Sequence, residues 1–198
     1  MNKTIDTYDE LAGTFAERWF KRLLVGELKF FRSRLKGKNV LDIGCGPGQD
    51  CKWLTEHGCR AIGIDASVGM LKEARKRVKT ARFVKMDMRK LRFPENSFDG
   101  LWVCASLLHI KKSQVKKVLT GFRKVLKHGG IMFIAVKAGS REKYESHKDL
   151  GKRFFSYYRK DELERLLRDS GFKIIKSHIT RDKKFKKIRW INLHARKI

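Results

Sequence analysis

The chain has 198 residues, of which 41% are hydrophobic and 11% aromatic, so it can fill one buried core and does not have the composition of a disordered segment. Its longest apolar runs, residues 100–108 and 131–136, are shorter than the roughly 20 residues of a membrane-spanning helix. Residues 1–9 are polar and lack the apolar stretch of a secretion signal. We therefore expect a cytoplasmic protein with one domain, residues 1–198.

The formal net charge is +27, from 48 Lys and Arg against 21 Asp and Glu. Such a charge predicts contact with a polyanion, and nucleic acid is a better match than an anionic membrane surface. Two basic clusters, at residues 72–92 and 181–189, are the candidate RNA contacts. General enrichment of the surface in lysine explains the charge equally well.

The four cysteines, at positions 45, 51, 59 and 104, match no zinc or redox spacing, and no Cys-x-x-Cys pair occurs. Reduced thiols are the ordinary state in the cytosol. We expect no disulfide and no metal site, and we interpret the cysteines as small buried residues.

In residues 6–35 apolar side chains recur every three or four positions, which predicts one or two helices and defines an N-terminal helical cap over residues 1–36. Strands and helices alternate after it. Short apolar runs predict seven strands, at residues 39–43, 61–64, 82–86, 98–106, 131–136, 171–178 and 190–196. Helical periodicity predicts helices at residues 49–57, after Ser67, at 114–127 and at 161–169.

Short connections in this alternation predict an α/β fold, a Rossmann-like doubly wound sheet with helices on both faces. Ser113 is predicted to cap the helix at 114–127, and Gly129 and Gly130 are predicted to end it. Residues 138–160 interrupt the pattern with charged and aromatic side chains, and we interpret them as a lid-like insertion.

Residues 40–48 read Val-Leu-Asp-Ile-Gly-Cys-Gly-Pro-Gly, a strand that runs into a glycine-dense turn and then a helix. Glycines let the backbone approach a ligand, and the helix N-terminus offers free N–H donors. The third glycine comes one residue too early for the dinucleotide pattern G-x-G-x-x-G. Asp42, just before the turn, disfavours a pyrophosphate and suits an ammonium group.

Two more carboxylates end successive strands. Asp65 ends the second, where an acid accepts hydrogen bonds from ribose hydroxyls, and Asp87 ends the third, where it suits an exocyclic amine. An amino acid group, a ribose and an adenine in a row are the parts of S-adenosylmethionine, which is the expected cofactor.

On these residues the chain resembles the class I S-adenosylmethionine-dependent methyltransferases over nearly its full length. The resemblance implies a seven-stranded sheet of order 3-2-1-4-5-7-6 whose last strand is antiparallel. The glycine turn would hold the methionine part, Asp65 the ribose and Asp87 the adenine edge. The cofactor-binding residues so implied are Asp42, Gly44, Cys45, Gly46, Gly48, Asp65, Ala66, Met70, Asp87, Met88, Cys104, Ala105 and Ser106.

The fourth-strand region looks like the subgroup that methylates small molecules and some tRNA wobble positions. In that subgroup the N-terminal helix covers the cofactor, which implies that Tyr8 and Trp19 border the pocket. The chain lacks the Asn/Asp-Pro-Pro-aromatic turn typical of amino-group methylation of bases, and Cys104 lacks the Pro-Cys context of cytosine carbon-5 methylation. Oxygen acceptors and small-molecule nitrogens stay open.

Methyl transfer from a sulfonium requires alignment and exclusion of water more than a dedicated catalytic group. His109 is a candidate general base, with a structural histidine as the alternative. Tyr157 is a candidate acceptor contact, with packing of the insertion as the alternative. We predict a methyltransferase acting on a small molecule by in-line displacement. A tRNA or RNA methyltransferase and a non-catalytic cofactor-binding scaffold subunit are the alternatives.

Overall fold

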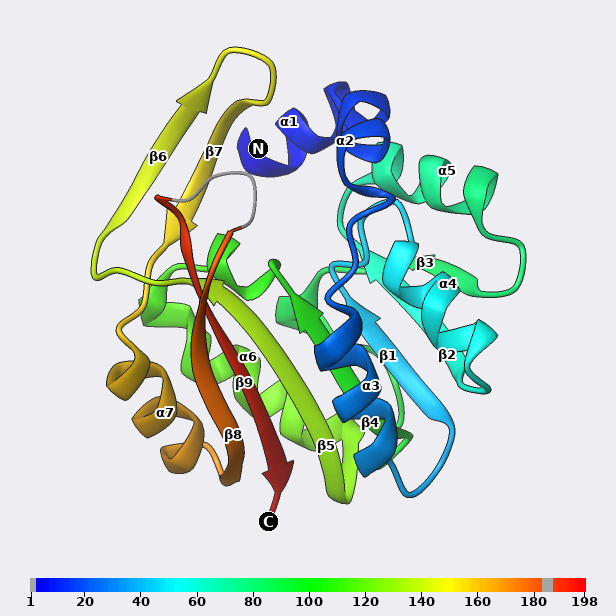
Figure 1. Ribbon diagram of the computed structural model, residues 1–198, viewed down its shortest axis with the longest axis vertical. Coiled ribbons are helices and arrows are strands. Elements are labelled where there is room, and N and C mark those ends of the chain that lie inside the picture. The colour runs from blue at the N-terminus through cyan, green and yellow to red at the C-terminus, as the bar shows by residue number, and fades with distance from the viewer. Residues whose placement is uncertain (1–2, 183–186) are drawn as a thin grey trace.

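The computed structural model describes residues 3–182 and 187–198 (Figure 1). Seven strands form the main sheet in the order β3-β2-β1-β4-β5-β9-β8. They are β1 (Asn39–Ile43), β2 (Arg60–Asp65), β3 (Arg82–Lys85), β4 (Phe98–Cys104), β5 (Leu126–Lys137), β8 (Phe172–Arg181) and β9 (Arg189–Lys197). β9 is antiparallel to both neighbours, and the other pairs are parallel. The predicted fold class and strand order are confirmed, with β8 and β9 as the sixth and seventh strands.

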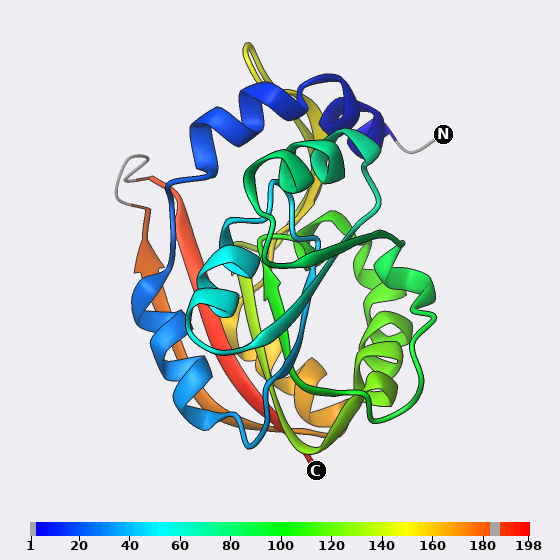
Figure 2. The same cartoon turned by 90° about the vertical axis from the view of Figure 1, so that its right-hand side faces the viewer.

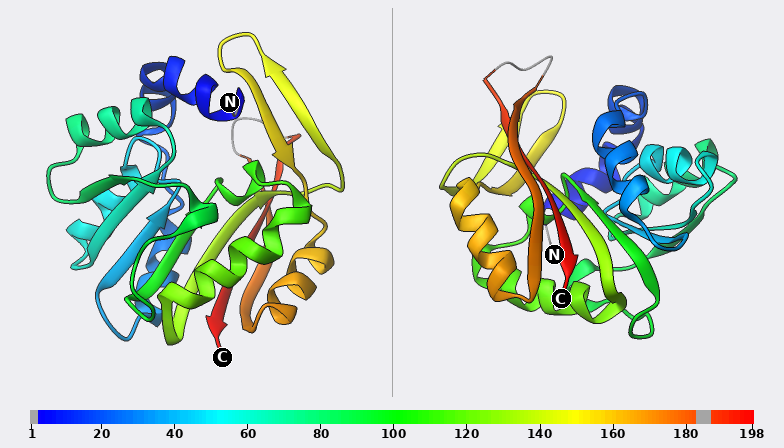
Figure 3. Two further views of the ribbon diagram at one scale, coloured as in Figure 1. Left: turned by 180° about the vertical axis from the view of Figure 1, so that it is seen from behind. Right: turned by 60° about the horizontal axis from the view of Figure 1, so that its bottom comes forward.

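Helices cover both faces of this sheet. On one face lie α3 (Val25–Arg34), α4 (Gln49–Glu56) and α5 (Val68–Arg77), and on the other lie α6 (Lys112–Val125) and α7 (Lys160–Asp169). Figure 2 shows α3 and α6 on opposite sides of the sheet, and the left view of Figure 3 shows α6 and α7 side by side on the back. The strands therefore lie in the middle layer of three.

β4 shows why a continuous apolar run forms a central strand. Leu101 and Val103 are fully buried against the α6 side, whereas Trp102 faces α3, with its ring 5.3 Å from Phe31 and 4.1 Å from Phe133. Successive side chains of a strand point to opposite faces, so a strand covered on both faces is apolar at consecutive positions, as residues 100–103 are.

Two local predictions around α6 are wrong. The helix begins at Lys112, so Ser113 lies inside it and does not cap it. The helix ends at Val125, and β5 already includes Gly129 and Gly130. The ladder between β4 and β5 is irregular between Phe98 and Gly100, and Gly129 has a φ of 73° there. The glycines thus allow an irregular strand start rather than a helix stop. Ser67 caps α5 as expected, since its hydroxyl accepts a hydrogen bond from the Met70 N–H at 3.0 Å.

Three helices, not one or two, form the N-terminal segment: α1 (Lys3–Glu10), α2 (Ala12–Trp19) and α3. Residues 138–160 contain an antiparallel hairpin, β6 (Glu142–His147) with β7 (Gly151–Ser156). Two 3₁₀ turns, η1 (Met88–Lys90) and η2 (Leu107–His109), follow β3 and β4.

α1 is attached at both ends. The Thr7 hydroxyl donates to the Lys152 carbonyl at 2.8 Å, and the Phe154 N–H donates to the Thr4 hydroxyl at 3.0 Å. At the other end Asp9 accepts hydrogen bonds from the Ser67 hydroxyl at 2.6 Å and from the Gly69 N–H at 2.8 Å. In Figure 1 the hairpin and α1 lie together at one end of the molecule, where the parallel strands end.

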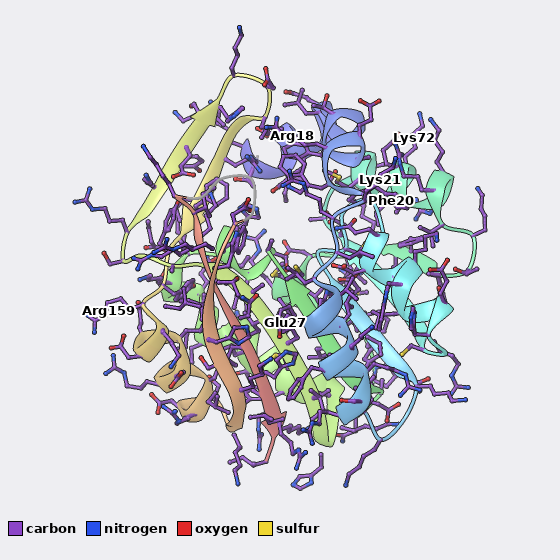
Figure 4. The ribbon with its side chains drawn as sticks, viewed as in Figure 1. Arg18, Phe20, Lys21, Glu27, Lys72 and Arg159 are labelled. Carbon is purple, nitrogen blue, oxygen red and sulfur yellow. The ribbon has the colours of Figure 1, made fainter. Side chains whose placement is uncertain are left out.

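The basic side chains whose positions are labelled in Figure 4 do not all lie on one side of the molecule. Figure 4 shows Lys72, on α5, and Arg159, before α7, on opposite sides of the molecule. Within the 72–92 cluster, Arg77 pairs with Glu73 and Arg89 pairs with Asp87. Residues 183–186 of the 181–189 cluster lie outside the described part of the chain.

All four cysteines are free, and three of them are buried, with Cys104 partly accessible. None of the helices in residues 3–182 and 187–198 combines the length and apolar character needed to cross a bilayer.

Candidate active site

A first cavity, with an empty volume of about 720 Å³ that is partly open to solvent, lies where the parallel strands end. The segments after β1 and β2 contribute Gly44, Gly46, Asp65 and Ala66. The α5 helix and the segments after β3 and β4 contribute Met70, Asp87, Met88, Ala105 and Ser106. Nine of the predicted cofactor-binding residues are therefore brought together by the strand order.

The glycine turn gives the cavity its close backbone wall. Gly44 has a φ of 73°, and a Cβ there would lie 2.3 Å from the Cβ of Ser106. Gly46 has a φ of 51°, and a Cβ there would meet no atom within 4 Å. Both positions need the left-handed backbone that glycine adopts readily. A side chain at Gly44 would collide with the protein, whereas one at Gly46 would take up empty space.

Asp65 is fixed by the backbone of the two turns that flank the cavity. Its carboxylate accepts hydrogen bonds from the Gly46 N–H and the Ser67 N–H, each at 2.9 Å. Burial raises the pKa of Asp65, while the backbone N–H groups act in the opposite direction. Each carboxylate oxygen has a second lone pair, so the group can still accept hydrogen bonds from a ligand in the cavity.

Asp87 lines the cavity but is already paired. Its carboxylate caps η1 through the Arg89 N–H at 2.8 Å, and the Arg89 guanidinium contacts both oxygens at 2.9 and 3.0 Å. Burial opposes ionisation, but the hydrogen bonds from Arg89 outweigh it and lower the pKa of Asp87. The predicted contact to an adenine amine must therefore share this carboxylate with Arg89, and the neighbouring Met88 also lines the cavity.

Asp42 does not line the cavity. Its side chain is 2% exposed and accepts a hydrogen bond from the Cys51 thiol at 3.3 Å. Burial, together with the nearby Asp50, raises the pKa of Asp42 well above its usual value. Asp50 has a pKa raised to about 6 by burial and accepts a hydrogen bond from the Trp102 indole at 2.9 Å. The structure thus places Asp42 behind the glycine turn rather than in front of a ligand ammonium.

Three other predicted residues also lie behind the cavity wall. Cys45 is buried, and Gly48 packs so closely that a Cβ would lie 2.8 Å from the Phe83 ring. Cys104 ends β4, and burial together with Asp50 and Asp42 raises the pKa of its thiol well above the usual value. A thiol in that environment is unsuited to act as a nucleophile.

A second cavity, with an empty volume of about 1,310 Å³, lies next to the first beneath the β6–β7 hairpin. Ala105 and His109 line both cavities. Ala105 has a φ of 53°, an unfavourable backbone conformation for a residue with a side chain. The two cavities therefore meet at the sharp turn that follows β4.

A chain of hydrogen bonds runs along this shared wall. The Arg153 guanidinium donates to the Tyr8 hydroxyl at 3.1 Å, and the Tyr8 oxygen lies 2.9 Å from Nε2 of His109. Nδ1 of His109 lies 2.7 Å from the Phe154 carbonyl, which can only accept. Nδ1 therefore carries the proton of the neutral ring, and Nε2 accepts from Tyr8. Both ring nitrogens of the candidate general base are occupied.

The buried environment keeps His109 neutral. Burial lowers its pKa to about 3, and the charges of Arg153 and Lys137 act in the same direction. Unfolding returns the ring to an ordinary pKa, so it binds a proton on unfolding below about pH 6.5. The stability that this group contributes at neutral pH is lost as the pH falls from about 6.5 toward 3.

We expect the free energy of unfolding of the wild-type chain to fall between pH 7 and pH 5 by about 2 kcal/mol more than that of His109→Gln. The reason is that glutamine keeps a polar side chain but does not titrate. Urea unfolding at both pH values measures this difference. Subtracting the change seen in the variant removes the contributions of the other ionisable groups. Equal losses in the two proteins would show that His109 is not held neutral by the fold.

Tyr157 lines neither cavity. Its hydroxyl donates to Glu145 at 2.5 Å, and burial followed by that carboxylate raises the pKa of Tyr157. Glu145 also accepts from Lys137 and Lys143, each at 3.0 Å. Tyr157 therefore contacts the second cavity through Glu145, which does line it.

Of the two aromatic residues expected beside the cofactor pocket, Tyr8 lines the first cavity, whereas Trp19 lines the second cavity and not the first. The sequence interpretation missed Thr4 and Ile5, which line the first cavity, and Lys137 and Arg153, which line the second. Only the concentration of aromatic and basic residues in the 138–160 insertion hinted at the second cavity.

The first cavity fits S-adenosylmethionine. The space in front of Gly46 is what a Cβ would fill, Asp65 lines the cavity with carboxylate oxygens that can accept from hydroxyl groups, and Met70 with Met88 gives apolar walls for a purine. Asp65, Gly44, Gly46, Met70 and Met88 are the residues that would hold it.

Comparison with known proteins agrees with this assignment. Residues 40–130 match a family model described as a methyltransferase domain. An uncharacterized methyltransferase of Synechocystis sp. is 35% identical over 95 residues, 48% of this chain and 45% of that protein. A demethylmenaquinone methyltransferase of Renibacterium salmoninarum is 30% identical over 129 residues, 65% of this chain and 52% of that protein. The matched region spans about half the length of these two relatives.

The fold is shared with solved structures. One is the Burkholderia thailandensis 1,6-didemethyltoxoflavin-N1-methyltransferase with bound 1,6-didemethyltoxoflavin and S-adenosylhomocysteine. It superposes with a TM-score of 0.76 over 98% of this chain and 84% of that one, at 21% identity. The sheet order, the glycine turn and the family match point the same way. Residues 40–130 thus match a methyltransferase domain, and the fold of the chain is that of the class I S-adenosylmethionine-dependent methyltransferases.

Proposed function

We propose that the protein transfers a methyl group from S-adenosylmethionine in the first cavity to a small molecule in the second. The observation that carries this proposal is that the two cavities meet at Ala105 and His109. A ligand in each would bring its reacting end to the same wall, which is the alignment that in-line displacement requires. The demethylmenaquinone methyltransferase relative, named for a small-molecule substrate, supports the same substrate class.

When bound, S-adenosylmethionine supplies an electrophilic methyl group on a sulfonium. In the proposed mechanism Asp65 orients it by accepting hydrogen bonds from ribose hydroxyls, and the backbone at Gly44 and Gly46 lets it approach closely. The α1 helix and the hairpin exclude water from the meeting point of the cavities. The Tyr8 hydroxyl donates to Nε2 of His109 at this point, so a base role for His109 requires both that Tyr8 turn away and that the ring become solvated enough to raise its pKa.

An RNA acceptor is the second candidate, and the net charge of +27 favours it. The position of Lys72 and Arg159 on opposite sides of the molecule supports the alternative that the charge is a general property of the surface (Figure 4). The second cavity, which is partly open to solvent and lined by aromatic side chains, is suited to a small ligand rather than to a duplex.

Two measurements test the proposal. Calorimetry with S-adenosylhomocysteine should show one binding site per chain. Incubation with methyl-tritiated S-adenosylmethionine and a cell extract, split into a low-molecular-mass fraction and RNA, should place the label in the first fraction and leave it there after ribonuclease treatment. Label confined to RNA would favour the RNA methyltransferase, and cofactor binding with no labelled product would favour the scaffold subunit. Absence of binding would overturn the proposed function.

A further inference from the structure

The second cavity has an unusual combination of walls. The rings of Phe15, Trp19, Tyr144, Phe155 and Trp190 line it. Phe15 and Trp19 are stacked, with centroids 5.3 Å apart and planes 29° from parallel. Aromatic walls of this kind favour a flat, apolar ligand body through stacking and burial of its surface.

Cationic side chains lie among these rings. Lys137, Lys143 and Arg153 line the cavity, against the carboxylates of Glu145 and Asp182. One carboxylate, Glu145, serves both lysines at 3.0 Å. The wall therefore carries more positive than negative charge, although a half-buried cation is costly unless it is paired.

Arg153 is the cation without a carboxylate partner. Among residues 3–182 and 187–198, no acidic oxygen lies within 4.0 Å of its guanidinium. Its charge rests against three rings, at 4.9 Å from the Phe15 centroid, 5.1 Å from Phe155 and 5.5 Å from Tyr8. Its Nε is buried and has no hydrogen-bond partner among the described atoms. A guanidinium with no carboxylate partner, held between aromatic rings at a cavity wall, is suited to bind a planar oxyanion.

We propose that the methyl acceptor is a small planar aromatic acid whose ionised oxygen group is bound by Arg153. This inference rests on the proposed function, because it assigns the second cavity to the acceptor. Arg153 also donates to Tyr8, which contacts His109 on the wall shared with the first cavity. An acid bound by Arg153 would thus lie within reach of the point where the two cavities meet.

The test uses two probes of the same shape and different charge, 2-naphthoate and 2-naphthamide, titrated into the protein saturated with S-adenosylhomocysteine. Wild type should bind the carboxylate about 10-fold to 100-fold more tightly than the amide, which is the range expected for a charge-assisted hydrogen-bonded pair. Arg153→Met should abolish this preference, and Arg153→Lys should retain part of it. Lys152→Met removes the neighbouring exposed cation and should leave the preference unchanged.

Affinity for S-adenosylhomocysteine, measured in each variant, separates this proposal from the proposed function. Normal affinity with equal binding of the two probes to wild type would overturn the assignment of Arg153. So would a carboxylate preference that survives in Arg153→Met. If the wild-type protein does not bind S-adenosylhomocysteine, the proposed function itself is overturned. Equal binding of the two probes by the wild-type protein overturns the assignment even where Arg153→Met does not fold, and Arg153→Lys then carries the comparison of variants.

Discussion

Asp65→Ala should weaken S-adenosylhomocysteine binding by about 100-fold or more, since two hydrogen bonds to a charged acceptor contribute about 3 kcal/mol or more together. The carboxylate lines the first cavity and is held in place by the N–H groups of Gly46 and Ser67. Alanine removes the acceptor and leaves these two donors without their partner. Calorimetry measures the affinity directly.

The control for Asp65 is Asp169→Ala, which removes an exposed carboxylate at the end of α7 and should leave the affinity unchanged. Asp65→Asn keeps the shape of the side chain but removes its charge. Its affinity for S-adenosylhomocysteine should lie between those of the wild type and the alanine variant. If Asp65→Ala binds within threefold of wild type while remaining folded, the ribose contact proposed for this residue is wrong.

Gly44→Ala should lower the free energy of unfolding by about 2 to 5 kcal/mol, the sum of a left-handed backbone with a Cβ and an overpacked contact. The new Cβ would lie 2.3 Å from the Cβ of Ser106. Gly46→Ala is the matched variant, because it has a positive φ but no atom within 4 Å of the added Cβ. Gly46→Ala should lower the free energy of unfolding only through the unfavourable left-handed backbone, by about 1 to 2 kcal/mol.

Denaturant unfolding of both variants measures this difference, and the double variant Gly44→Ala with Ser106→Gly should recover part of the loss. Gly46→Ala should in addition weaken cofactor binding, because its methyl group takes up space in the first cavity. Equal destabilisation by the two alanine variants would contradict the close contact between the glycine turn and Ser106.

The sequence predicted the structure best where a residue pattern is compatible with a single local structure. The apolar runs, which alternate with segments of helical periodicity, predicted the strands of the sheet. The glycine-dense turn after β1 predicted the position of the first cavity. Asp42 shows the limit of this approach. Val40 faces α3 and α4, whereas Leu41 and Ile43 face α6, and Asp42 shares the face of Val40. Because β1 is buried on both faces, its sequence alone could not show that this carboxylate does not line the first cavity.

The second cavity could not be predicted for a different reason. Lys137 is 9% exposed, and Arg153 is half-buried among aromatic rings, but in the sequence they are two of 48 basic residues. Their burial results from the β6–β7 hairpin folding back over α1, a long-range contact with no local pattern. Similarly, glycines such as Gly129 and Gly130 are common at the ends of helices. Only the pairing of β5 with β4 shows that these two belong to a strand.

The attachment of α1 has a thermodynamic consequence. This helix supplies Thr4, Ile5 and Tyr8 to the first cavity, and it is held by polar contacts to α5 and β7 and by the contacts of Tyr8 with His109 and Phe15. A ligand that touches it only when it is docked must stabilise the docked form, and by reciprocity the docked form must raise the affinity for that ligand. A truncation or fused tag that frays the first residues would therefore reduce cofactor affinity without altering the glycine turn or Asp65.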